Sequence, residues 1–170
     1  ACPLKFKIAR DWNIPAELSG ALQYGSVVHN VLRDYFDSVR AARPHSMEKV
    51  VEIFKFGMEA VQFEDAYQQQ LYEKQGIEQL TAFIAARQQE APPNIRETEC
   101  SFRMTVGEST VTGRVDRVDE GSDGGIVIVD YKTGSPRSQE NADESLQLSV
   151  YALAAHKVWE KPLEKLVYYN

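Results

Sequence analysis

Two aspartates and a lysine lie at the end of a predicted β-hairpin in the second half of the chain. Asp130 and Lys132 are two residues apart on a strand, so their side chains project to the same side. A run of Ile and Val at 126–129 leads directly into them, and such a run is typical of a strand buried on both faces. A carboxylate and an ammonium at the end of that strand are costly to desolvate, so we expect them to serve a functional site there.

The hairpin brings a second aspartate to the same place. Residues 120–125 carry a dense turn signal between two β-prone runs. If the strands pair antiparallel across this turn, Asp116 lies opposite Asp130 or one residue away, with Cβ atoms about 5 Å apart. Like charges that close raise one of the two pKa values, and a hard cation such as Mg²⁺, which takes oxygen ligands, is the natural partner. Arg117 and Asp119, taken alone, are expected to be ordinary charges on a surface hairpin.

Length and composition predict one domain of ordinary size, over residues 1–170. The chain is 43% hydrophobic and 26% charged, which is typical of a globular protein. No apolar run approaches the ~20 residues of a membrane span and no secretory signal appears, so we expect a cytoplasmic protein with Cys2 and Cys100 as free thiols. The chain begins without Met and stops within a predicted strand, which favours a domain excised from a longer protein.

The overall charge argues against strong non-specific binding of nucleic acid by the whole surface. The net charge is −6 and the sequence pI is about 5.1. Basic residues are nevertheless uneven, with one group near the start and one around the hairpin: Lys5, Lys7, Arg10, Arg114, Arg117, Lys132 and Arg137.

The first half, residues 1–93, is predicted to be mainly helical. A basic and apolar stretch at 4–8 is followed by helices at 21–42, 47–62 and 65–90, each with apolar residues at helical spacing. The first long helix has Leu22, Val28, Leu32, Tyr35 and Phe36. The last has Leu71, Leu80, Phe83 and Ile84. Two prolines at 92–93 end this part.

The second half, residues 94–170, has a β-β-β-α-β order. Residues 99–106 alternate between apolar and polar side chains, which indicates a half-buried strand, and the hairpin follows. A helix is expected at 142–159, with Asn141 as N-cap and Glu144 three residues later. Residues 166–169 indicate a final strand.

Four further residues are ambiguous when the residues alone are considered. Glu99 is a solvated strand-face glutamate, unless its strand pairs beside Asp116, where it would add another carboxylate. His29 shares an apolar helix face, and such a histidine is more often part of the core than a ligand. Gln147 and Tyr151 are four apart and share a helix face, which favours an ordinary helix edge.

Five segments occur in one order along most of the chain: 24–29, Glu99, 113–119, 129–134 and 147–151. Together they resemble the RecB-like branch of the PD-(D/E)XK nuclease superfamily. The Gly-x-Val-Asp-Arg and Asp-Tyr-Lys-Thr-Gly sequences, at this separation, are a strong joint signal. The opening residues 2–7 are similar to the start of nuclease domains at the C-terminal end of UvrD/Rep-type helicases and of AddB-like proteins.

The resemblance implies an α/β (α+β) fold with a restriction-endonuclease-like core, in which helices flank a mixed β-sheet. It raises the ambiguous residues to expected site residues. The implied metal ligands are His29, Asp116, Asp130 and the carbonyl of Tyr131. The implied catalytic positions are Asp116, Asp130, Lys132, Gln147, Tyr151 and Glu99.

The implied activity is Mg²⁺-dependent hydrolysis of DNA phosphodiesters, with Mn²⁺ as a substitute, in DNA repair and recombination. The implied partners are DNA and a helicase motor that delivers the strand, since the acidic chain is expected to bind DNA weakly and in a salt-sensitive way. Some relatives hold an iron–sulfur cluster; Cys2 fits its early cysteine, but the three later ones are absent from this stretch, so no cluster is expected.

Two alternatives stay open. One is an inactive nuclease-like module that contacts DNA or braces a helicase. The other is an unrelated metal-dependent hydrolase that acts on small phosphates.

Overall fold

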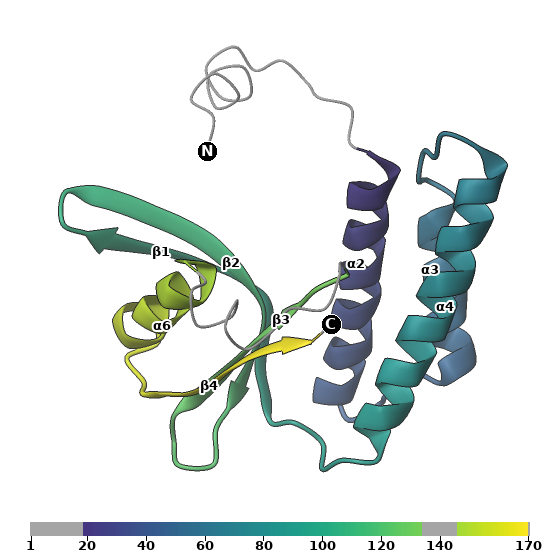
Figure 1. Cartoon of the computed structure of the whole chain (residues 1–170). Helices are drawn as coiled ribbons and strands as arrows, with labels where there is room; N and C mark the ends of the chain where they lie inside the picture. The colour runs from purple at the N-terminus through teal and green to yellow at the C-terminus, as the bar shows by residue number, and fades with distance from the viewer. Residues whose placement is uncertain (1–18, 134–145, 170) are drawn as a thin grey trace.

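The computed structural model describes residues 19–133 and 146–169 (Figure 1). In chain order these residues form three helices, three antiparallel strands, a fourth helix and a final strand. The helices are α2 (Gly20–Arg40), α3 (Met47–Met58), α4 (Ala66–Gln88) and α6 (Leu146–Val158). The strands are β1 (Ile95–Val106), β2 (Ser109–Glu120), β3 (Ile126–Tyr131) and β4 (Leu163–Tyr169). The helix predicted at 4–8, Cys2 and the N-cap predicted at Asn141 lie outside the described residues.

The four strands form one mixed sheet in the order β1-β2-β3-β4. The pairs β1–β2 and β2–β3 are antiparallel, whereas β3 and β4 are parallel and are connected through α6. Figure 1 shows α2, α3 and α4 together beside the sheet, with α6 close to the β1–β2 ribbon. The predicted fold class, α+β with a helical N-terminal half, is confirmed.

A polar side chain precedes each of the helices α2, α3 and α4. Ser19, Ser46 and Asp65 each accept a hydrogen bond from the backbone N–H three residues later. The helix predicted at 47–62 ends earlier, at Met58, where the chain turns back toward α2. There the backbone N–H of Gln62 donates to the side-chain oxygen of Gln23.

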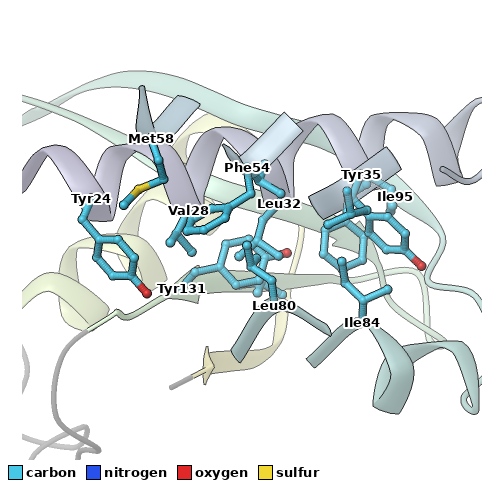
Figure 2. Packing of buried hydrophobic residues seen from close by; sticks show 14 residues of the cluster. Tyr24, Val28, Leu32, Tyr35, Phe54, Met58, Leu80, Ile84, Ile95 and Tyr131 are labelled. Carbon is cyan, nitrogen blue, oxygen red and sulfur yellow. The ribbon is translucent and has the colours of Figure 1, made fainter. Parts of the chain in front are cut away.

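Strand β3 separates two hydrophobic clusters. Val129 and Tyr131 face α2, α3 and α4, and Figure 2 shows Tyr131 among side chains of those helices. Ile126 and Ile128 pack on the other side with α6. The run at 126–129 is therefore covered on both faces, as its composition predicts.

Three apolar residues that were expected in buried stripes are exposed. Leu22 lies in the first turn of α2 and Leu71 on the outward side of α4, where 62% and 50% of their surfaces are accessible. Val106 is the last residue of β1 and is 37% exposed. None of the described helices is both long enough and apolar enough to cross a membrane.

Candidate metal and catalytic site

The β2–β3 register brings the two predicted aspartates together. Arg117 pairs with Val129, so the next residues along the two strands, Asp116 and Asp130, face each other. The backbone N–H of Tyr131 donates to Asp116 Oδ2 at 2.7 Å and fixes one side of that carboxylate. This register agrees with the sequence-based prediction for the hairpin.

Helix α2 and strand β1 add a histidine and a third carboxylate. His29 Nδ1 lies 3.1 Å from Asp116 Oδ1. Glu99 faces Asp116, because the flanking pairs join residues 98 to 117 and 100 to 115. One donor atom from each of His29, Glu99 and Asp116 lies within 4.8 Å of the others, so the three residues could hold a metal ion.

The backbone at Glu99 has an unusual conformation. Its φ angle is +50°, in the left-handed region that residues with a Cβ atom seldom adopt. Such strain costs on the order of 1–3 kcal/mol and is concentrated at functional sites in folded proteins. The Glu99 side chain is 17% exposed and its Oε2 lies 3.0 Å from Arg114 Nε, so an arginine borders the three-residue group.

The electrostatic surroundings of His29 are negative. The hydrogen bond to Asp116 raises the pKa of His29, burial opposes this, and the charges of Asp116, Glu99 and Asp130 raise it further. The same field that favours a proton on this imidazole favours a metal cation at the group.

Asp130 belongs to a second, adjoining group. Its side chain is only 5% exposed, and its Oδ2 forms an ion pair with Lys132 Nζ. Gln147 Nε2 donates to Asp130 Oδ1 at 2.9 Å, and Tyr151 Oη lies 3.1 Å from the same oxygen. Lys132 Nζ also donates to Gln147 Oε1 at 3.1 Å, so the four side chains form one network.

Burial raises the pKa of Asp130, the hydrogen bond from Lys132 lowers it, and the charge of Asp116 raises it again. Because Asp116 and Asp130 face each other across β2 and β3, the two groups are neighbours. A cation placed between them would relieve the repulsion.

Helix α6 contributes two side chains to the group around Asp130. Gln147 and Tyr151 both reach Asp130, and Tyr151 Oη also donates to the carbonyl of Arg114 at 3.0 Å. Spacing alone could not reveal this, because the partners lie on two strands far away in the sequence. The carbonyl of Tyr131 as a metal ligand stays a prediction.

The expectation that Arg117 and Asp119 lie on the surface was wrong. The two residues are 4% and 7% exposed and form a two-point ion pair, with Nε–Oδ1 and Nη2–Oδ2 distances of 2.9 Å. Arg117 Nη1 also donates to Tyr131 Oη at 2.8 Å, and its guanidinium lies 4.1 Å from the centre of the Phe36 ring. Burial raises the pKa of Asp119, and the Arg117 guanidinium opposes this.

A cross-strand signal could have revealed this buried pair. Arg117 and Asp119 pair with Val129 and Val127, which belong to the run that the sequence predicts to be buried. Residues directly opposite each other share a face of the sheet. The hairpin register therefore places both charges on the face that packs against α2.

A family model agrees with the fold. No curated protein matches the sequence. Among solved structures, protein VC1899 from Vibrio cholerae is similar at 13% identity with a TM-score of 0.32, over 89% of this chain and 44% of that chain. This chain thus spans less than half of that protein. The family model of the PD-(D/E)XK nuclease superfamily matches residues 1–170, and the chain belongs to that superfamily.

Proposed function

We propose that this domain is a metal-dependent deoxyribonuclease of the RecB-like kind, which hydrolyses DNA phosphodiester bonds in end processing linked to a helicase. One observation carries the proposal. Three carboxylates, a histidine and a lysine converge where α2 meets the interior of β1 and β2 and the end of β3, in a member of a nuclease superfamily.

The donor set fits a hard divalent cation. His29, Glu99 and Asp116 offer one imidazole nitrogen and two carboxylates within 4.8 Å of one another, and Asp130 adds a nearby negative charge. Oxygen-rich sets with one imidazole suit Mg²⁺ or Mn²⁺. When bound, such a cation lowers the pKa of a coordinated water and neutralises phosphate charge.

The lysine supplies the second part of the chemistry. Asp130 and Gln147 hold Lys132 Nζ beside the carboxylates, where the ammonium can orient a water or stabilise negative charge that develops on the phosphate oxygens. Tyr151 restrains Asp130 from the side of α6. The backbone N–H of Tyr131 does the same for Asp116, so both carboxylates are oriented before a substrate arrives.

The decisive experiment is cleavage of end-labelled single-stranded and double-stranded DNA with Mg²⁺ or Mn²⁺, alongside circular DNA, RNA and nucleotides. We expect Lys132→Ala and Asp130→Ala to lose cleavage by roughly 10²–10³-fold or more. Lys165→Ala is the matched control, because Lys165 is an exposed lysine on the neighbouring strand β4. This control should cleave like the wild type.

Three outcomes would favour other functions. Retained metal-dependent cleavage by folded Asp130→Ala would refute the proposed site. Metal binding in calorimetry together with DNA binding but no cleavage would favour an inactive, helicase-bracing module. Hydrolysis of nucleotides but not of DNA would favour a hydrolase of small phosphates.

A further inference from the structure

The outward face of the β1–β2 ribbon leads directly away from the site. Alternate residues of a strand share a face, so the register defines successive rows across the ribbon. The row of Glu99 and Asp116 belongs to the site. The next rows are Ser101–Arg114, Arg103–Thr112 and Thr105–Thr110.

Burial separates the two faces of the ribbon. Phe102 and Met104 are 4% and 5% exposed and belong to the cluster that packs with α6. The alternate residues Ser101, Arg103, Thr105, Thr110, Thr112 and Arg114 are exposed. A hollow on this part of the ribbon is lined by Ser101, Phe102, Arg103, Thr112, Gly113 and Arg114. Figure 1 shows the ribbon extending away from α2, α3 and α4.

The outward face is cationic and rich in hydroxyl groups. Its three rows carry two arginines, three threonines and one serine, and no carboxylate; Glu108 lies in the turn beyond them. Arg114 connects the face to the site through its contact with Glu99 at 3.0 Å, and Arg103 lies one row further out. This composition contrasts with a chain whose net charge is −6.

We propose that this face binds the sugar–phosphate backbone of the DNA strand on one side of the cleaved bond; the inference rests on the proposed function. We call the face the ribbon track: Ser101, Arg103, Thr105, Thr110, Thr112 and Arg114. Arginine forks and hydroxyl groups are the side chains that contact phosphates without reading the base sequence. The track has no apolar side chain in these rows, so a nucleic-acid backbone fits it better than an apolar protein surface.

The length of the track suits an extended strand. Six residues separate Glu99 from Thr105, which corresponds to about 20 Å along a β-strand. A stacked nucleic-acid strand advances about 3.4 Å per nucleotide, so roughly six nucleotides reach from the row of Glu99 to Thr105, about four of them over the track itself. A strand that lies along the track reaches the site at the row of Glu99 and Asp116.

The test separates binding from cleavage. Fluorescence anisotropy of labelled single-stranded DNA in EDTA measures Kd over a range of salt concentrations. We expect Arg103→Glu to bind DNA roughly tenfold more weakly, since one attraction becomes a repulsion. The slope of log Kd against log salt concentration should fall by about 0.7, the value for one lost phosphate contact on a single strand. Arg103→Gln, with no introduced charge, should show the same direction with a smaller loss.

Arg43→Glu is the matched control, because it makes the same charge change at an exposed arginine between α2 and α3. It should bind like the wild type. Equal Kd values for Arg103→Glu and the wild type would overturn the track. Equal weakening of Arg103→Glu and Arg43→Glu would also overturn it, since net charge alone would explain both.

A short substrate distinguishes this inference from the proposed function. Thymidine 5′-p-nitrophenyl phosphate is too small to reach Arg103 from the site, so its hydrolysis should be equal in Arg103→Glu and the wild type. Loss of this reaction in Arg103→Glu would overturn the track, because the variant would then act on the site. DNA binding that depends on Arg103, in a wild-type protein that cleaves neither substrate, would support the track and refute the nuclease proposal.

Discussion

Strand β2 carries two sets of charges on neighbouring residues, and they differ in where their partners come from. Arg117 and Asp119 are buried and neutralise each other, with Tyr131 and Phe36 completing the surroundings of the guanidinium. Asp116 is the next residue along the strand, yet it joins Glu99 and His29 in a group with excess negative charge.

The pair of Arg117 and Asp119 has a structural role, whereas the group of Asp116, Glu99 and His29 remains available to a ligand. In the buried pair each charge is neutralised by its partner, and removal of one partner leaves an unpaired buried charge. Glu99 and Asp116 are partly exposed and face each other with one arginine against Glu99, so a cation can neutralise the charge that remains. Stability and metal response should therefore distinguish the two sets.

The largest effect on stability is expected for Arg117→Met. This change leaves the Asp119 carboxylate buried without its partner and should lower the free energy of unfolding by about 3–5 kcal/mol. Urea unfolding at neutral pH measures it. The double variant Arg117→Met/Asp119→Leu should recover most of the loss, and a loss below about 1 kcal/mol in the single variant would place Arg117 outside the structural set.

A smaller effect on stability, with loss of the metal response, is expected for Asp116→Asn. The asparagine oxygen can still accept from Tyr131 N–H, and one of several like charges disappears, so the free energy of unfolding should stay within about 1 kcal/mol of the wild type. Mn²⁺ should raise the melting temperature of the wild type, because it binds only the folded chain, but not that of the variant.

A destabilisation of Asp116→Asn as large as that of Arg117→Met would erase the distinction between the two sets. An unchanged rise in melting temperature with Mn²⁺ would place the metal elsewhere in the protein.

The smallest effect concerns Glu164, a carboxylate whose hydrogen bonds come from the backbone. Burial raises its pKa, but the N–H groups of Asp123, Gly125 and Ser122 lower it, and the net shift is downward. A carboxyl group with a lowered folded pKa adds stability above its unfolded pKa of about 4.3, and this is lost as the pH falls through the folded pKa.

Glu164→Gln should therefore be less stable than the wild type at neutral pH, and the difference should shrink as the solution is acidified below about pH 4. Unfolding curves at a series of pH values measure this convergence. A difference that stays constant down to pH 2 would mean that the charge of Glu164 does not stabilise the β2–β3 turn.

Local pattern was sufficient for the elements and for the hairpin register. Polar caps at Ser19, Ser46 and Asp65 and the glycines of the β2–β3 turn act within a few residues, and Gly124 there has a φ of +82°. The same pattern could not place Leu22 or Leu71. Whether an apolar position is covered depends on which other element packs against it, and that is a long-range property.

The sequence by itself determined the helical half, the β-β-β-α-β order and the placing of Asp116 within one residue of the position opposite Asp130, since these follow from propensity, period and turn chemistry. Only the tertiary structure decided that His29 and Glu99 join Asp116, that Gln147 and Tyr151 hold Asp130, and that Arg117 is buried. Each of those contacts spans distant parts of the chain. Side-chain partners that far apart are chosen by the packing of whole elements, which no local pattern records.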